Sequence, residues 1–195
     1  MWFAGTTSRS KNSVRSKQPL APAIMIVLMA GLPGTGKSTL ARELAARVGA
    51  SVIGKDEIRH ALFSARDLEY STEQDDFVMG IMLEATAWIL RKDTGRIVVL
   101  DGRTFSRRYQ IERVLQAATE LHQPWRILEC VCSDETAHRR IELQASAGEH
   151  VAGNRTVDLY VAVKARFEPI TLHKTIIDTD LPLEKCVNQA VAAIR

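Results

Sequence analysis

The sequence predicts an α/β fold in which a five-stranded parallel sheet carries helices on both faces. Two observations predict it. Apolar runs alternate with patterns of helical period along most of the chain, which is typical of strands joined by crossover helices. Several of these runs are continuously apolar, as expected for strands that are covered on both sides. The five expected strands are "AIMIVLMA", "SVIG", "RIVVLD", "WRILECVC" and "HKTIID".

Helical patterns fill the segments between these strands. The first expected helix, "KSTLARELAARVGA", has Leu40 and Leu44 on one face and ends at Gly49. Ser71 and Gln74 can form a capping box at the start of a long helix. Further helices are expected in "DEIRHALFS", "VDLYVAVKARF" and "LPLEKCVNQAVAAI", over 106–121, and after Ser133, whereas "QASAGEHVAGN" is expected to be a loop.

Residues 24–195 are expected to form one domain, preceded by a disordered basic extension over residues 1–23. The extension is rich in Ser, Lys and Arg, contains no acid and includes two prolines near its end. A transit peptide has a similar composition, so that alternative stays open. Apolar runs are far shorter than the roughly 20 residues that a membrane helix needs.

Charge and cysteine content narrow the classes of function. Four basic residues in the extension account for the net charge of +3, because the remaining 22 basic residues meet 23 acidic ones. The domain therefore gives no indication of a nucleic-acid-binding surface. Cys130, Cys132 and Cys186 lack the spacing of a metal site, and reduced thiols are typical of a cytoplasmic protein. The sequence does not indicate an oligomeric state.

A phosphate-binding pattern follows the first expected strand. Residues 31–38, "GLPGTGKS", match G-x-x-x-x-G-K-[ST] between a strand and a helix, which predicts a P-loop NTPase fold. Glycines let backbone N–H groups approach a polyanion, and the helix N-terminus adds positive charge. Lys37 can reach the β- and γ-phosphates, and the Ser38 hydroxyl can bind Mg²⁺. The residues expected to bind the nucleotide are Gly31, Gly34, Thr35, Gly36, Lys37, Ser38 and Thr39.

An acid also ends the third expected strand. Asp101 follows four apolar residues, as does the aspartate that holds Mg²⁺ in P-loop proteins. Because parallel strands end at one edge of the sheet, Asp101 is expected near Ser38, and the two are the predicted metal ligands. A strand-end aspartate that caps the next turn is the alternative interpretation.

An acid and an arginine follow the second expected strand. Asp56 and Arg59 are three residues apart, so they share a face if a helix begins here. A carboxylate near a transferring phosphoryl group can accept a hydroxyl proton, and an arginine can hold an anionic group. Alternatively, Asp56 is a helix N-cap and Arg59 a surface charge. Glu57 is expected to face solvent.

Together these motifs resemble the small P-loop kinases of the AAA-domain "predicted kinase" group, which are related to zeta toxins, gluconate kinases and the kinase domain of phage polynucleotide kinase. The resemblance spans about residues 24–195. It rests on "GLPGTGKSTLA", "VIGKDEIR", "IVVLDGRTFSRR", "RFEP" and "IIDTD". None of these motifs is specific for a substrate.

The resemblance implies roles on the acceptor side. Asp56 would activate the acceptor hydroxyl, and Arg59 would help to bind the acceptor or the transferring phosphate. Arg103 is the arginine of "GRTFSRR" expected nearest the site, as a second substrate-binding residue, whereas Arg107 and Arg108 are expected to begin an exposed helical face.

The resemblance also implies a small lid, at about residues 145–157. Arg140 would approach the phosphates from the lid-side helix and, with Lys37 and Asp56, form the catalytic set. Relatives often have a second arginine where this chain has Gln144, so Arg139 or Arg155 could replace it. The "DTD" segment that ends at Asp180 would lie near the adenine, unless Asp180 caps the last helix.

The expected function is transfer of the γ-phosphoryl group of ATP, with Mg²⁺, to a hydroxyl group of a small molecule. The alternatives are a kinase for polynucleotide 5′-hydroxyls, which the nearly neutral domain disfavours, and an ATPase switch without a phosphorylated acceptor. The chain lacks the N-K-x-D string that reads guanine, which favours ATP over GTP.

Overall fold

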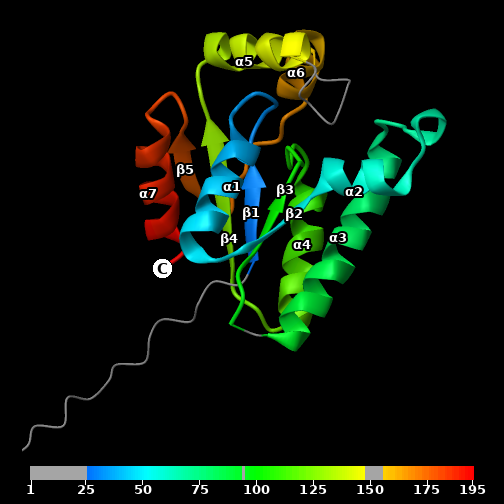
Figure 1. The fold of residues 1–195 in the computed structure, drawn as a ribbon, viewed down its shortest axis with the longest axis vertical. Coiled ribbons are helices and arrows are strands. Elements are labelled where there is room, and N and C mark those ends of the chain that lie inside the picture. The colour runs from blue at the N-terminus through cyan, green and yellow to red at the C-terminus, as the bar shows by residue number, and fades with distance from the viewer. Residues whose placement is uncertain (1–25, 94, 148–155) are drawn as a thin grey trace, which may run out of the picture.

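The computed structural model describes residues 26–93, 95–147 and 156–195. It contains a five-stranded sheet in which every pairing is parallel, so the predicted fold class is confirmed (Figure 1). The strand order across the sheet is β2-β3-β1-β4-β5. The strands are β1 (Ile26–Ala30), β2 (Ser51–Gly54), β3 (Val98–Asp101), β4 (Trp125–Val131) and β5 (Thr175–Asp178).

Helices cover both faces of the sheet. The core joins α3 and α4 to one face and α1 and α7 to the other, while α5 and α6 lie beyond the carboxyl ends of the strands (Figure 1). None of the helices in the described ranges is long and apolar enough to cross a membrane. The helices are α1 (Lys37–Val48), α2 (Lys55–Leu62), α3 (Thr72–Lys92), α4 (Arg108–Glu120), α5 (Asp134–Ala147), α6 (Val157–Ala165) and α7 (Leu183–Ala193).

Strand β1 shows why its sequence is continuously apolar. All five of its residues are completely buried. Ile26 and Leu28 pack in the core under α3 and α4, whereas Val27 and Met29 pack in the core under α1 and α7. Each such side chain contributes about 1.5–3 kcal/mol relative to an exposed one. A strand with two covered faces has no position left for a polar residue.

The topology directs the functional segments to one edge of the sheet. Strand β1 lies between β3 and β4: the chain first forms β2 and β3 on one side of β1 and then crosses from β3 to β4 and β5 on its other side. Ligands of open α/β sheets bind at the carboxyl edge beside such a reversal. Gly54 pairs with Asp101 there, which places the start of α2 beside the end of β3.

The lid region differs from the prediction. Helix α5 continues to Ala147, so the first residues of the predicted loop at 144–154 are helical and that part of the prediction is wrong. Alanine is the strongest helix former, and the Ser146 hydroxyl donates to the Glu142 carbonyl of the same helix (2.9 Å). Val157 begins α6. The rest of the predicted lid, 148–155, and the predicted extension, 1–23, lie outside the described residues.

The predicted capping box at the start of α3 forms only in part. The Ser71 hydroxyl accepts a hydrogen bond from the Gln74 N–H group (3.1 Å), as predicted. The Gln74 side-chain oxygen, however, accepts from the backbone N–H group of Glu69 (2.9 Å). Gln74 therefore closes the preceding turn instead of completing the box.

The glycine loop after β1 gives a test of the fold at the sheet edge. A β-carbon on Gly31 would lie 2.3 Å from the Cys130 carbonyl oxygen, whereas one on Gly49 would meet no atom within 4 Å; both have positive φ. Gly31→Ala is expected to lower the free energy of unfolding by about 3 kcal/mol, through collision and backbone strain together. Gly49→Ala, which carries the strain alone, is expected to cost about 1 kcal/mol. Urea unfolding of both variants measures the difference, and equal losses would contradict the collision.

Candidate active site

The glycine loop between β1 and α1 has the backbone geometry of an anion site. Gly31, Gly34 and Gly36 have φ values of 129°, 76° and 78°, which residues with a β-carbon rarely adopt. Gly36 is the N-cap of α1, so the positive end of that helix opens at the loop. Successive N–H groups in such a loop form a concave site for phosphate.

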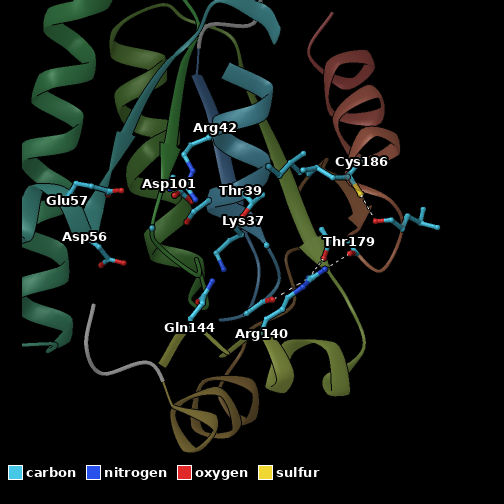
Figure 2. Close-up of a pocket in the computed structure, with 17 residues that line it drawn as sticks. Lys37, Thr39, Arg42, Asp56, Glu57, Asp101, Arg140, Gln144, Thr179 and Cys186 are labelled. Carbon is cyan, nitrogen blue, oxygen red and sulfur yellow. Dashed lines mark hydrogen bonds between the residues drawn. The ribbon is translucent and has the colours of Figure 1, made fainter. Parts of the chain in front are cut away.

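A cavity of about 460 Å³ opens in front of this loop (Figure 2). Its volume lies in the range of small-molecule sites. Five of the residues predicted to bind the nucleotide line it, whereas Gly31 and Thr35 lie buried behind its wall. Glu57, predicted to face solvent, is exposed but lines this cavity as well. The charged and polar lining residues are Lys37, Ser38, Thr39, Arg42, Asp56, Glu57, Asp101, Arg140, Gln144 and Thr179.

Lys37 lies in the wall of this cavity, between the glycine loop and α2. Its side chain is buried, and its Nζ donates a hydrogen bond to the Leu32 carbonyl oxygen (2.6 Å). The Thr35 hydroxyl donates to the same carbonyl (2.8 Å). The ammonium group therefore helps to hold the loop in shape, at a position that faces the cavity.

Asp101 ends β3 in the same wall. It is only 4% exposed, and its Oδ1 has no hydrogen-bond partner within the described part of the chain. A buried carboxylate oxygen without a donor costs about 1–3 kcal/mol or more, and a bound cation would remove that cost. Ser38, the other predicted metal ligand, lines the same cavity. The residues present therefore fit a divalent cation.

Asp56 and Arg59 lie on the buried face of α2. Gly54 is the N-cap of this helix, so Asp56 belongs to its first turn, and the alternative of an Asp56 N-cap is wrong. Arg59 is only 1% exposed, so it is not a surface charge. Arg59 Nη1 contacts Asp56 Oδ1 (3.3 Å), and Nη2 pairs with Asp75 of α3. Burial lowers the pKa of the Arg59 guanidinium, and the charge of Asp56 opposes that effect.

Lys55 completes a cluster of four charged groups with these residues. Its Nζ lies 2.7 Å from Asp75 Oδ1 and 3.8 Å from Asp56 Oδ1. Gly102, at the end of β3, has a φ of 93°, and a β-carbon there would lie 2.9 Å from that of Lys55. The glycine therefore allows the first turn of α2 to approach the strand end closely.

A second cavity, of about 370 Å³, opens on the other side of Asp56. Lys37, Asp56 and Gly102 line both cavities, so the two meet at these residues. Arg59 and Arg103, the predicted substrate-binding arginines, line the second one. The topology thus brings together residues from α1, α2 and the segment after β3, which the sequence had only suggested as neighbours.

The arginines after β3 follow the prediction only in part. Arg103 is buried, and its Nη2 lies 2.7 Å from Asp76 Oδ1. Arg108 is exposed, as predicted, and pairs with Glu112 (2.7 Å). Arg107 is half-buried and lines the second cavity, so its prediction as an exposed helical residue is wrong. Glu168 holds it there (2.9 Å), a contact between segments that are distant in the sequence.

Arg140 lies at the far end of the first cavity from Asp56, with Lys37 between them in the view of Figure 2. Its Nη2 donates to the Thr179 carbonyl (2.7 Å) and its Nη1 to the Thr179 hydroxyl (3.0 Å). That hydroxyl lies 3.0 Å from the Thr35 carbonyl, to which it donates. Arg140 and Thr179 therefore join α5, the segment after β5 and the glycine loop.

The alternatives for the lid arginine also differ in their placement. Arg139 is exposed and lines neither cavity, and Arg155 lies outside the described residues. Gln144 lines the first cavity, and its buried Oε1 has no partner in the described ranges. Asp180 accepts from the Ser133 N–H group (2.7 Å) before α5, so it does not cap α7, whose N-cap is Pro182.

The comparisons with known proteins agree with this geometry. Residues 26–170 match the model of a family described as AAA domain.

The chain belongs to the AAA domain family.

Among curated proteins, this AAA domain is 32% identical over 183 residues to uncharacterized proteins of Mycobacterium tuberculosis and Mycobacterium bovis. The match covers 86% of the chain and 34% of each relative, so the chain spans about a third of the length of these curated relatives.

Solved structures share the fold of this AAA domain. A proposed kinase of Chloroflexus aurantiacus superposes with a TM-score of 0.69 at 18% identity, over 89% of this chain and 100% of that one. A gluconokinase of Sinorhizobium meliloti gives 0.62 at 16% identity, over 89% and 92%. The APS kinase CysC of M. tuberculosis, in complex with AMPPNP and APS, gives 0.62 at 17% identity, over 89% and 98%. The P-loop NTPase fold of the chain is therefore confirmed.

Thr179 is one of the site residues that the motifs did not single out, as are Asp75 and Arg166, although Thr179 stands in the "DTD" segment after β5. Thr179→Val is expected to lower the free energy of unfolding by about 1–3 kcal/mol, because the buried Thr35 carbonyl and Arg140 guanidinium lose a partner. Thr119 is a matched control, since its exposed hydroxyl also donates to a carbonyl (Leu115, 2.9 Å). Thr119→Val is expected to change stability by less than about 0.5 kcal/mol. Equal effects in chemical unfolding would show that the Thr179 contacts do not join these segments.

Proposed function

We propose that this AAA domain is an ATP-dependent kinase that transfers the γ-phosphoryl group to a hydroxyl of a small molecule. The observation that carries the proposal is that Lys37 and Asp56 line both cavities. A phosphate in the first cavity and a hydroxyl in the second would meet beside a buried carboxylate. The structural relatives that are named as kinases support the proposal through their shared fold.

The first cavity would hold ATP. The N–H groups of the glycine loop would surround the β- and γ-phosphates, and Lys37 would exchange the Leu32 carbonyl for a phosphate oxygen. Ser38 and Asp101 would hold Mg²⁺, which supplies charge neutralisation on the phosphates when bound. Leu181, Leu183 and Cys186 give the opposite end of the cavity the apolar character that suits a base.

The transfer itself needs one carboxylate on the acceptor side. The acceptor oxygen would bond to the γ-phosphorus as the bond from phosphorus to the bridging oxygen breaks and ADP leaves. The hydroxyl proton would pass to Asp56, which mainly orients the hydroxyl before transfer. Arg59 Nη1, 3.3 Å from Asp56 Oδ1, would hold the carboxylate in position for this role.

Arg140 would act from the other side of the phosphates. A guanidinium there can stabilise the negative charge that spreads over the transferring group, an effect of about 10³–10⁵ in rate in related enzymes. In the structure its N–H groups contact Thr179 and the Gly34 carbonyl (3.5 Å). Contact with phosphate would therefore require a small shift of this side chain along the wall of the first cavity.

Transfer of label from γ-labelled ATP to a panel of small hydroxy compounds tests the proposal. The natural sequence is expected to label an acceptor, and Asp56→Asn to slow that transfer about 10²–10⁴-fold while ATP affinity changes little, because the amide cannot take the proton. Asp67→Asn, an exposed change outside both cavities, is the control. If the label is released only as inorganic phosphate, the chain is not a kinase; if Asp56→Asn transfers normally, Asp56 is not the base.

A second prediction concerns the cation. Asp101→Asn is expected to raise the Mg²⁺ concentration needed for half-maximal ATP binding about tenfold or more. Without Mg²⁺ the same variant is expected to keep its free energy of unfolding, since the lost charge was buried without a partner at Oδ1. Calorimetric titration and urea unfolding in a chelator measure the two effects. An unchanged Mg²⁺ requirement would remove Asp101 from the metal site.

A further inference from the structure

The second cavity has a wall rich in positive charge. Six of its lining side chains are cationic and two are carboxylates, Asp56 and Asp75. A cavity that received only an uncharged hydroxy compound would have no need for such an excess, because each buried cation carries a desolvation cost. The cationic lining residues are Lys37, Lys55, Arg59, Arg103, Arg107 and Arg166.

Carboxylates behind the wall balance only part of this charge. Asp76 pairs with Arg103 (2.7 Å), and Glu168 pairs with Arg107 (2.9 Å). Lys55 and Arg59 share Asp75 and contact Asp56. Arg166, at the end of α6, makes no ion pair with a carboxylate within the described part of the chain, so its charge remains available to a ligand.

Two buried arginines in the wall also have unmet hydrogen-bond donors. Arg59 and Arg103 are 1% and 3% exposed, and the Nε of each has no hydrogen-bond partner within the described part of the chain. Leaving a buried donor unpaired costs about 1–3 kcal/mol, and more for a charged group. Beyond the dominant effect of burial, the charge of Arg103 also contributes to the lowered pKa of Arg59. The two like charges are therefore close enough to repel each other.

We propose that the acceptor is a small hydroxy compound that also carries a phosphate, sulfate or carboxylate group, held in the second cavity by Arg103 and Arg166. This inference rests on the proposed function and names the class of its substrate. The anionic group would accept from the guanidinium groups of these two lining arginines, and its negative charge would relieve the repulsion between the buried Arg59 and Arg103. Its hydroxyl would lie toward Asp56 and Lys37, where the cavities meet.

The rest of the wall fits the neutral part of such a compound. Tyr70 and Tyr109 contribute aromatic rings, and Leu159 and Val163 of α6 contribute an apolar patch. The volume of about 370 Å³ matches a small molecule and not a polymer. The wall therefore has cationic side chains for an anionic group and aromatic and apolar side chains for the neutral part of the compound.

Binding of inorganic sulfate tests the inference without any catalytic turnover. The full chain is first saturated with AMPPNP and Mg²⁺, which fills the glycine loop, and sulfate is then titrated while the Nε–H NMR signals of the arginines are followed. The signals of Arg59 and Arg103 are expected to shift. The Kd for sulfate is expected to rise about tenfold in Arg166→Gln and in Arg103→Gln, the loss of one charge-assisted contact.

Arg108→Gln is the matched control, because Arg108 is exposed and lines neither cavity. Its Kd is expected to change less than about twofold, as for a surface charge. Arg166 is exposed too, so Arg166→Gln remains informative if Arg103→Gln does not fold. No shift of the buried arginine signals, or equal losses in all three variants, would overturn the anion site.

Matched acceptors separate this inference from the proposed function. In the label-transfer assay, glycerate and glycerol 3-phosphate, which carry a carboxylate and a phosphate, are each expected to be better acceptors than uncharged glycerol. Transfer only to uncharged compounds would overturn the anionic acceptor and leave the kinase intact. If no compound is labelled, the proposed function fails, and sulfate titration alone decides whether the cavity binds anions.

Discussion

The buried ion-pair cluster at the start of α2 is the interaction on which the arrangement of the site depends. Lys55, Asp56 and Arg59 come from one helix turn, and Asp75 comes from α3. The pairs compensate one another in a region with little access to water, where removing one partner costs about 3–5 kcal/mol. Because every partner is needed, the carboxylate of Asp56 is held at one position, the junction of the two cavities.

Two other constraints allow this cluster to form. Gly102 permits α2 to approach the end of β3, and the reversal of the chain at β1 places the glycine loop beside it. The glycine loop is in turn joined to α5 and to the end of β5 through Arg140 and Thr179. The two halves of the site therefore rest on separate sets of contacts. Lys37, which lines both cavities, is the cation that the two halves share.

Much of the fold follows from local sequence. The strands are predictable because burial on both faces of the sheet requires continuous apolar runs. The glycine loop is predictable because its glycines stand at the positions where the backbone needs a positive φ. The end of α5 was missed because small residues suit loops and helices alike, and alanine favours the helix. Asp56 and Asp101 are predictable because each lies at or just after the end of a strand. The carboxyl ends of parallel strands meet at one edge of the sheet, so the two acids lie close together.

The charge of the second cavity was beyond the reach of sequence, because it depends on contacts between distant segments. Arg107 becomes part of the wall only through Glu168, 61 residues away, and Thr179 gains its role only through α5. Nor does a balanced domain charge reveal that cations gather in one cavity. The nearly neutral net charge of the domain argues against a nucleic-acid-binding surface, yet it is compatible with a locally cationic cavity for a small anion.

A crystal structure of the chain with AMPPNP, Mg²⁺ and a hydroxy compound that it phosphorylates tests most directly whether the acceptor binds beside Asp56. We expect the γ-phosphate beside Lys37 and the acceptor in the second cavity, with its hydroxyl oxygen within hydrogen-bond distance of the Asp56 carboxylate. An acceptor bound elsewhere, with its hydroxyl remote from the Asp56 carboxylate, would contradict this role of Asp56.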